Sequence, residues 1–447
     1  LRSVGEVCTL VFAGERYQQI APGEFTINPN QAKDFEEVIE TVAGKSPSLY
    51  GVVQCWTTEA GVGNGINSEE LGSLSKLGCG TTLSLVQALV KGGLSTVPRL
   101  WLVTNGAQAV PNNHPVIPGV AQSSVWGMGK VISWEHPELN CTRIDLDPEE
   151  TLEGKVDGLF KEIWSEDRED QVAWRGDGRY VARLVGSHHR QLVAQQADGK
   201  TQKPLSFRSE ASYLITGGMG GLGLLVASWM VSKGAKHLIL LGRRSPDDAT
   251  RKKITELEMA GASVVVEKAD VTDLESMKGV LQRIEESKRP LVGVIHSVMV
   301  LSNGVLRNQT WSSFEQVMEP KVQGAWHLHQ LTQSQPLDFF VLFSSATSLL
   351  GSLGQGMANY SAANGFLDGL AHYRRTMGLP GLSIHWGAVS QVGRALGRDT
   401  ETAAMLSKNG MGLISPAQVL ESLELLMSGS DVEVGVMPIA TDIGLGS

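Results

Sequence analysis

Three polar side chains in the segment 343–371 have the types and spacing needed to move a proton. Ser345 ends an apolar run, Tyr360 follows in a stretch of small residues, and Asn364 stands four residues further on. Residues four apart lie on one face of a helix, so Tyr360 and Asn364 are expected to project to the same side. A phenol with a pKa of about 10 donates protons slowly at neutral pH, and a nearby cation would lower that pKa.

Lys321, in the segment EPKVQGAWHLHQL, is the strongest candidate for this cation. Proline is favoured in the first turn of a helix, so Pro320 predicts a helix that begins here, with Lys321 in its first turn. A lysine at such a position is equally consistent with an ordinary surface charge, and Tyr360 with a packed core tyrosine. The hypothesis requires that Lys321 and Tyr360 meet in the folded chain.

A glycine-rich loop follows an apolar strand in YLITGGMGGLGLLVASWM and opens a predicted helix. Gly218, Gly220 and Gly223 form the pattern GxGxxG, in which glycines allow a tight turn and close approach of a pyrophosphate to the helix N-terminus. The alternative is a glycine-rich turn without a ligand, and the strand and helix on either side favour binding. The residues predicted to contact a dinucleotide here are Thr216, Gly217, Gly218, Met219, Gly220, Gly221, Leu222 and Gly223.

The ends of the next two predicted strands indicate which dinucleotide binds. Arg243 and Arg244 stand where an NAD site usually carries an acidic residue, and an arginine there accommodates the 2′-phosphate of NADPH. A solvated surface arginine is the alternative for one of the two. Asp270 and Val271 close the third strand, where Asp270 is placed to meet the adenine ring or, alternatively, to cap a helix.

The second half of the chain alternates apolar strands with helical segments, which indicates an α/β fold. Continuous apolar strands are typical of a parallel sheet that helices cover on both faces, and seven of them predict a doubly wound sheet. The predicted strands are 213–218, 237–244, 262–271, 291–298, 338–345, 382–389 and 432–439. Ser345 would then lie at the carboxyl edge, where open α/β sheets bind their ligands.

The first half alternates less regularly. Its predicted strands are 9–14, 50–56, 99–107 and 141–147, followed by a hairpin over 171–185 that turns at Gly176–Gly178. The segment 195–212 is polar and contains glycine and proline, so we place a domain boundary there, between residues 1–207 and residues 208–447. The second unit alone carries a recognisable dinucleotide loop.

Composition excludes several classes of function. The 447 residues carry a net charge of -9, which argues against nucleic acid or an anionic membrane as the main partner. No apolar run approaches the ~20 residues of a membrane span. The four cysteines lie in the first third without CxxC spacing, which favours reduced thiols and a cytoplasmic location, and the sequence shows no metal-binding motif. The chain begins at Leu1 without a visible signal peptide, so we expect a piece of a longer protein.

These motifs together resemble the ketoreductase domain of modular polyketide synthases, a specialised member of the short-chain dehydrogenase/reductase superfamily. In the second half the resemblance rests on TGGMGGLG, LLGRRS, PKVQGAWHLH, YSAANGFLDGLAHYRR and SIHWGAV, and in the first half on RLWLVTNGAQAV and SVWGMGKVISWEHPELNCTRIDLDP. It implies two Rossmann-like lobes, a truncated structural subdomain followed by a catalytic subdomain that binds NADPH. In this family a lysine and an asparagine exchange places relative to most short-chain reductases, which assigns the missing charge to Lys321 and the other position to Asn364.

The resemblance implies NADPH-dependent reduction of a β-ketoacyl thioester, carried by the phosphopantetheine of an acyl carrier protein beside other domains of the same synthase module. Tyr360 would protonate the developing alkoxide, and Ser345 would donate a hydrogen bond to the same oxygen. Lys321 would lower the pKa of the phenol and contact the nicotinamide ribose, with Tyr360 also beside the cofactor. Asn364 would help to hold this network, while the hydride chemistry belongs to the cofactor.

Two departures from the family pattern concern the substrate pocket. Val298 and Met299 replace a small alanine–glycine pair beside the nicotinamide, where their bulk would crowd the cofactor. Residues 301–303 read Leu-Ser-Asn in place of the fingerprint of one stereochemical class, and Leu350 replaces the tryptophan of the opposite class. The configuration of the product is therefore not readable from these fingerprints.

A third departure is an apparent insertion, Gly356–Met357, in the loop before the tyrosine. A loop absorbs two residues cheaply, but catalytic geometry tolerates little displacement. The segment 403–426, with Met405 and Met411, predicts amphipathic helices that lie over the substrate in the family, although core packing explains the same pattern. Two alternatives to an active reductase stay open. One is a degenerate domain kept as a module scaffold, and the other is an α-epimerase that uses the same pocket without net reduction.

Overall fold

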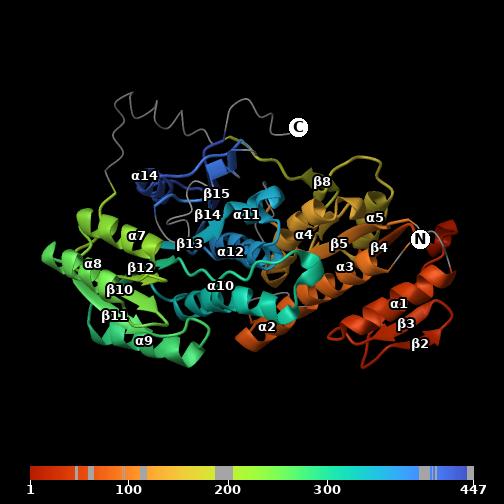
Figure 1. The fold of residues 1–447 in the computed structure, drawn as a ribbon, viewed down its shortest axis with the longest axis horizontal. Coiled ribbons are helices and arrows are strands. Elements are labelled where there is room, and N and C mark those ends of the chain that lie inside the picture. Colours follow the sequence, from red (N-terminus) through yellow and green to blue (C-terminus); the bar gives the residue numbers. More distant parts are fainter. Residues whose placement is uncertain are drawn as a thin grey trace.

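The computed structural model describes residues 1–45, 49–58, 65–92, 94, 96–110, 118–186, 205–391, 403–404, 406–407 and 410–439. The chain folds into two Rossmann-like α/β lobes that lie side by side, with a small sheet and one helix at the N-terminal end (Figure 1). Within the described ranges, no helix combines the length and the apolar character that crossing a membrane requires.

The larger sheet has seven parallel strands and confirms the predicted doubly wound lobe. Its strands are β9 (Ser212–Thr216), β10 (His237–Gly242), β11 (Ser263–Lys268), β12 (Leu291–His296), β13 (Phe339–Ser345), β14 (Leu382–Trp386) and β15 (Glu433–Val436). Their order in space is β11-β10-β9-β12-β13-β14-β15, so the chain order reverses between β9 and β12. Sheets of this topology bind ligands at the carboxyl edge, beside such a reversal.

Helices cover both faces of this sheet because alternate side chains of each strand point to opposite sides. Along β10, Leu238 and Leu240 belong to one buried cluster, whereas Ile239 and Leu241 belong to the other. The helices α7 (Gly221–Ser232), α8 (Asp248–Met259) and α14 (Pro416–Met427) pack on the first face, and α9 (Leu274–Glu286), α10 (Trp311–Leu331) and α12 (Ala358–Thr376) on the second.

The smaller lobe contains a five-stranded sheet in simple chain order. Its strands are β4 (Gly51–Gln54), β5 (Arg99–Asn105), β6 (Thr142–Leu146), β7 (Gln171–Arg175) and β8 (Gly178–Val181), and its helices are α2 (Ser68–Ser75), α3 (Thr81–Lys91), α4 (Ser123–Glu135) and α5 (Leu152–Ile163). The first four strands are parallel and β8 is antiparallel to β7, which confirms the predicted hairpin. Its turn contains Gly176 with φ 52°, a backbone conformation that favours glycine.

The predicted strand 9–14 forms as β1 (Leu10–Ala13), but it lies outside the sheet of the first lobe. It pairs with β3 (Glu24–Ile27), which also pairs with β2 (Gln18–Ala21), in a separate three-stranded sheet beside α1 (Ala32–Lys45). The sequence analysis missed β2 and β3. Both are only four residues long and lack the continuous apolar run by which the other strands were found.

The prediction that a helix begins at Pro320 is wrong. Helix α10 begins at Trp311, after a capping box in which the Thr310 hydroxyl accepts the Ser313 amide and the Ser313 hydroxyl accepts the Thr310 amide. Pro320 lies inside the helix, where a proline removes one backbone hydrogen bond at a cost of about 3 kcal/mol. The buried face of α10 offsets this cost, and Lys321 therefore sits in the middle of a packed helix.

The two lobes meet where α4 of the first packs against α12 of the second, and glycines allow this contact. A Cβ on Gly127 would lie 2.1 Å from the carbonyl oxygen of Ser361, and one on Gly365 would lie 3.1 Å from the Gly127 nitrogen. One hydrophobic cluster continues from the first lobe into the second. The first lobe is thus a close-fitting support for α12, the helix that carries Tyr360 and Asn364.

The predicted linker between the lobes falls partly on residues 187–204, which lie outside the described residues. The ring of Phe207 contacts Tyr213, Trp229 and Phe339, with centroid separations of 5.2, 5.4 and 5.9 Å. Phe207 therefore packs with the second lobe. The division into residues 1–207 and 208–447 stays a prediction.

Candidate active site

A cavity of about 1040 Å³ opens at the carboxyl edge of the larger sheet, a volume suited to a dinucleotide together with a substrate. Most of the predicted site residues line it: Gly217, Met219, Gly220, Gly221, Leu222, Gly223, Arg243, Arg244, Asp270, Val271, Lys321, Ser345 and Tyr360. Thr216, Gly218 and Asn364 are buried behind the wall of this cavity. The Thr216 hydroxyl is in hydrogen-bond contact with Nδ1 of His296 at 2.8 Å, so it supports the loop from below.

The glycine loop is built so tightly that side chains would not fit at three of its positions. Gly217 has φ 67°, and a Cβ there would lie 2.8 Å from the Ser297 carbonyl oxygen. A Cβ on Gly218 would lie 2.6 Å from the carbonyl oxygen of Ile215, and one on Gly223 would lie 2.5 Å from that of Gly217. The loop therefore has the close backbone packing that a dinucleotide loop requires.

The N-terminus of α7 points into this loop with its amide groups uncapped by any side chain. Gly220 is the N-cap residue, and the first turn contains no acidic side chain. The first amides of a helix have no intrahelical partner and attract anions. This terminus, at the wall of the cavity, fits the pyrophosphate of a dinucleotide.

Arg243 and Arg244 are exposed on the cavity wall just after β10. Among the described residues, neither guanidinium takes part in a salt bridge, so both are available to an anionic ligand. Asp270 accepts hydrogen bonds from the amide and hydroxyl of Thr272, at 3.0 and 2.9 Å. The alternative role of Asp270 as a helix cap is wrong, because Asp273 caps α9.

Lys321 is buried, with 2 % of its surface exposed, and it lies against Tyr360. Its ammonium nitrogen is 5.4 Å from the centroid of the Tyr360 ring and donates a hydrogen bond of 2.7 Å to the carbonyl oxygen of Phe343. Burial lowers the pKa of Lys321 to about 7, and the carboxylate of Asp368 acts in the opposite direction. The structure thus brings together the two residues on whose meeting the sequence hypothesis depends.

The structure does not show the expected lowering of the phenol pKa. Burial raises the pKa of Tyr360 above its ordinary value of 10, while hydrogen bonding with Asn364 and Ser345 acts in the opposite direction. The physical reason is that the phenolate loses its water, and this loss outweighs the neighbouring donors. Lys321 does not reverse this effect, because it donates a hydrogen bond to a backbone carbonyl and its own charged form is disfavoured by burial.

Asn364 and Ser345 hold the surroundings of the phenol. The Asn364 amide nitrogen donates to the carbonyl oxygen of Tyr360 at 2.7 Å, one turn earlier in α12, while its side-chain oxygen is buried without a hydrogen-bond partner among the described residues. The half-buried Ser345 is the N-cap of the short helix α11 (Ala346–Leu349), where its hydroxyl oxygen accepts the Thr347 amide at 3.3 Å. The hydroxyl proton of Ser345 is therefore directed toward the phenol side of the cavity, where hydrogen bonding with Ser345 acts to lower the pKa of Tyr360.

Several of the departures from the family pattern lie on the same wall. Val298 and Met299 both line the cavity, and Met299 has 46 % of its surface exposed there. Met357, of the insertion, and Met411 also line it, whereas Met405 lies outside the described residues. Bulky flexible side chains thus surround the space left for a substrate.

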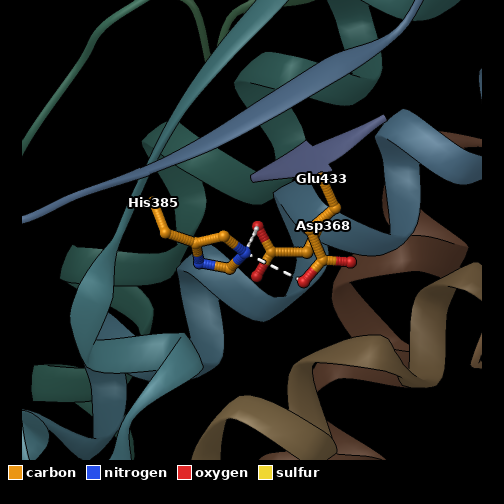
Figure 2. Close-up of side chains that lie close together, drawn as sticks. All are labelled: Asp368, His385 and Glu433. Carbon is orange, nitrogen blue, oxygen red and sulfur yellow. Dashed lines mark hydrogen bonds and ion pairs between the residues drawn. The ribbon is translucent and has the colours of Figure 1, made fainter. Parts of the chain in front are cut away.

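A cluster behind Ser345 joins the buried His385 of β14 to two carboxylates, of which Asp368 is buried and Glu433 is exposed (Figure 2). His385 Nε2 lies 2.9 Å from Glu433 of β15 and 3.5 Å from Asp368 of α12, while Nδ1 lies 3.1 Å from the carbonyl oxygen of Ser345. Nδ1 also lies 3.0 Å from the Ser348 hydroxyl, which can donate or accept, so the two carboxylates at Nε2 are the groups that favour the charged ring. Burial opposes the charged form, but Asp368 and Glu433 together raise the pKa of His385.

This cluster is also the group of described residues whose ligand atoms, within 4.8 Å of one another, lie close enough to hold a metal ion. The sequence analysis found no metal-binding motif. A lysine of the protein lies near these carboxylates, because Lys130 of α4 interacts electrostatically with both Asp368 and Glu433. Burial lowers the pKa of Lys130, and the two carboxylates act in the opposite direction. Asp368 was detectable from its spacing of four residues after Asn364, whereas Glu433 has no local signal.

Comparisons with known proteins agree with this geometry. Residues 211–391 match the family described as the KR domain, and residues 19–184 match the Rossmann fold domain of the polyketide synthase extender module SpnB. The chain is a ketoreductase domain of the modular polyketide synthase family. Ketoreductase domains are oxidoreductases of β-keto groups and bind a nicotinamide cofactor in their Rossmann fold.

The curated relatives that this domain matches are much longer proteins. It is 34% identical to a phenolphthiocerol/phthiocerol polyketide synthase of Mycobacterium tuberculosis over 81% of this chain, and 35% identical to polyketide synthase GfsB of Streptomyces halstedii over 76%. It spans only 19% and 6% of those two proteins. A solved structure of A-type ketoreductases from a modular polyketide synthase matches with TM-score 0.79 and 29% identity, covering 94% of this ketoreductase domain and 84% of that chain. An A1-type ketoreductase matches with TM-score 0.80 and 27% identity, covering 97% and 89%.

Proposed function

We propose that this domain reduces a β-ketoacyl thioester, tethered to an acyl carrier protein, to the β-hydroxyacyl thioester, with NADPH as the reductant. The observation that carries the proposal is that one cavity is lined both by the glycine loop and by Lys321, Ser345 and Tyr360. A cofactor bound at the loop and a carbonyl group beside the phenol would share this space. The relatives, which are polyketide synthases, support other domains of one synthase module as partners.

The chain's own residues would manage the proton and the developing charge. NADPH, when bound, supplies the hydride for the β-carbon. Tyr360 donates its phenolic proton to the carbonyl oxygen as that oxygen becomes an alkoxide, and Ser345 donates a hydrogen bond to the same atom. Lys321 stabilises the phenolate that results, because its nitrogen lies 5.4 Å from the ring centroid. Asn364 fixes the turn of α12 that carries the phenol.

The choice of NADPH over NADH rests on Arg243 and Arg244. Both guanidinium groups are exposed at the end of β10 on the cavity wall, where the ribose of a bound dinucleotide lies in this fold. A guanidinium pairs strongly with a phosphate group, in a charge-assisted and often bidentate contact. The 2′-phosphate is the group that distinguishes NADPH from NADH.

A second candidate is a degenerate domain that does not reduce, acting as a module scaffold or as an α-epimerase. The exposed side chain of Met299 in the cavity, next to Val298, favours it. Bulk on the nicotinamide side would prevent the cofactor from approaching the carbonyl while leaving Tyr360 and Lys321 untouched. This alternative predicts that NADPH is not oxidised.

The two candidates are separated by following nicotinamide absorbance while the protein is mixed with NADPH and a β-ketoacyl N-acetylcysteamine thioester. Oxidation of NADPH by the protein is expected. Binding of NADPH without turnover would favour an epimerase or a blocked site, and no binding at all would favour a scaffold.

The same assay tests the cofactor preference. The double variant R243A/R244A is expected to raise KM for NADPH about tenfold and to leave KM for NADH nearly unchanged. The matched control is Arg251→Ala in α8, an exposed arginine that pairs with Asp248 and does not line the cavity. Equal losses with both cofactors would contradict the proposed phosphate contact.

A further inference from the structure

Two loops of the second lobe form part of the cavity wall near the start of the tyrosine helix. The first cavity loop (297–305) follows β12, and the second cavity loop (350–357) precedes α12. The side chains that they contribute to the wall include Leu301, Asn303, Leu353 and Met357. A hydrogen bond of 2.8 Å from the amide of Gly304 to the carbonyl oxygen of Gly356 joins the two loops.

One carboxylate from the other lobe binds both loop regions. Glu135 is the last residue of α4. Its Oε2 accepts the amide of Leu306 at 2.7 Å, directly after the first cavity loop, and its Oε1 accepts the amide of Gly356 at 2.7 Å, in the second. Hydrogen bonds to an ionised carboxylate are roughly twice as strong as those between neutral groups. The spacing of the two loops is therefore set by the width of a single side chain.

The neighbouring contacts give this carboxylate a fixed position. Gln87 of α3, also in the first lobe, donates to the carbonyl oxygens of Leu306 and Gln309, at 2.8 Å each. The apparently inserted residue Gly356 has φ 71°, a conformation in which glycine is not strained, and presents its amide to Glu135. Because α4 packs directly on α12, the helix that carries Glu135 is held against the helix of Tyr360.

We propose that Glu135 is a positioning residue, which sets the spacing of the cavity loops and thereby the acyl chains that the site accepts and the ketone face that it presents. This inference rests on the proposed reductase function. Glu135 lies in the first lobe and does not line the cavity, so its effect passes through the loops. Loss of one of its two acceptors would leave a loop amide without its partner and let that loop move.

The test uses Glu135→Gln, because glutamine keeps one acceptor oxygen and presents an NH₂ group to the other loop amide. The probe is the N-acetylcysteamine thioester of 2-methyl-3-oxopentanoic acid, reduced with NADPH. We expect KM for the probe to rise about tenfold and the ratio of alcohol diastereomers to shift, with kcat within about threefold and Kd for NADPH unchanged. Glu135→Asp keeps the charge but is one methylene shorter, and should give intermediate values. The control is Glu138→Gln, which removes a surface carboxylate bonded to His136.

An unchanged KM and an unchanged diastereomer ratio in Glu135→Gln would overturn the proposal, even if the melting temperature fell. Failure of the wild-type protein to oxidise NADPH is a different result, because it refutes the proposed function. In that case amide hydrogen exchange decides on Glu135 itself. Faster exchange of the peptides that contain Leu306 and Gly356 in Glu135→Gln would support the joining of the loops, and unchanged exchange would overturn it.

Discussion

The two lobes repeat one construction, a parallel sheet with polar groups at its carboxyl edge, but they treat those groups in opposite ways. In the second lobe the edge opens into a cavity, with uncapped helix amides and with arginines that form no salt bridge among the described residues. In the first lobe the edge is filled by the ion pair of Arg175 and Asp145, whose side chains are 1% and 0% exposed. Asp145 also accepts the amides of Ala107 and Gln108, at 2.8 and 3.0 Å, and the hydroxyl of Thr104 at 2.6 Å.

The comparison indicates that the carboxyl edge of a Rossmann-like sheet can bind a ligand only where its polar groups have no partner within the protein. Buried donors and acceptors must be satisfied, and the first lobe satisfies them internally. Arg175 occupies, within its own sheet, the space next to the strand ends that a ligand would require, and it donates to the carbonyl oxygens of Asp145, Leu146, Trp174 and Gln108. The first lobe has thereby become a support, and the contacts of α4 show what it supports.

The largest effect is expected from Tyr360→Phe, because it tests whether the chemistry belongs to the second lobe alone. Removal of the phenolic proton donor should lower kcat by about 10³-fold, a typical contribution of general acid catalysis, with Kd for NADPH nearly unchanged. Steady-state kinetics and cofactor titration would measure both. The matched change in the first lobe is Tyr180→Phe in β8, which should leave kcat unchanged. Reduction at the wild-type rate by Tyr360→Phe would remove the phenol from the mechanism.

The second prediction concerns stability, and here the larger effect is expected in the first lobe. Arg175→Met leaves Asp145 buried without its ion-pair partner, and such a change typically costs about 3–5 kcal/mol of the free energy of unfolding. Arg243→Met in the second lobe removes an exposed guanidinium and should change it by less than about 0.5 kcal/mol. Denaturant unfolding of the two variants measures both quantities. Equal stabilities would mean that the filled edge of the first lobe contributes nothing to folding.

The parts of this architecture that are local in sequence could be predicted, and the parts that join distant segments could not. Continuous apolar runs indicated the strands of the larger sheet, and the spacing of Tyr360 and Asn364 placed both on one helix. The start of α10 was mispredicted because the proline signal at Pro320 is local, whereas the capping box and the buried face that override it extend over the whole helix.

The supports of the site depend on contacts with no sequence signal. Glu433 reaches His385 across 48 positions of the chain, because β15 pairs in parallel with β14. Glu135 reaches Gly356 across 221 positions, from one lobe to the other. From sequence alone, a carboxylate that accepts distant backbone amides cannot be distinguished from an ordinary surface charge. The candidate reacting groups therefore have a local sequence signal, whereas the residues that position them do not.

The last prediction concerns the pH dependence of stability, and it compares one lysine from each lobe. Burial lowers the pKa of Lys321 from its ordinary 10.5 to about 7, so between those values the unfolded chain binds a proton that the folded chain does not. The stability that Lys321 allows at pH 10.5 is thus lost as the pH falls toward 7, by up to about 1.4 kcal/mol per pH unit. The free energies of unfolding of the wild type and Lys321→Met, measured with denaturant across this pH range, should differ by this slope, with the variant relatively more stable at pH 7.

Lys161 of α5 gives the comparison from the first lobe. It is exposed, and its hydrogen bond to Asp157 raises its pKa. Lys161→Met should therefore remove a small effect of opposite sign, a stability that is present at neutral pH and is lost above pH 10.5. The same slope in wild type and Lys321→Met would mean that the ammonium is solvated, and that the second lobe does not hold a desolvated cation against its phenol.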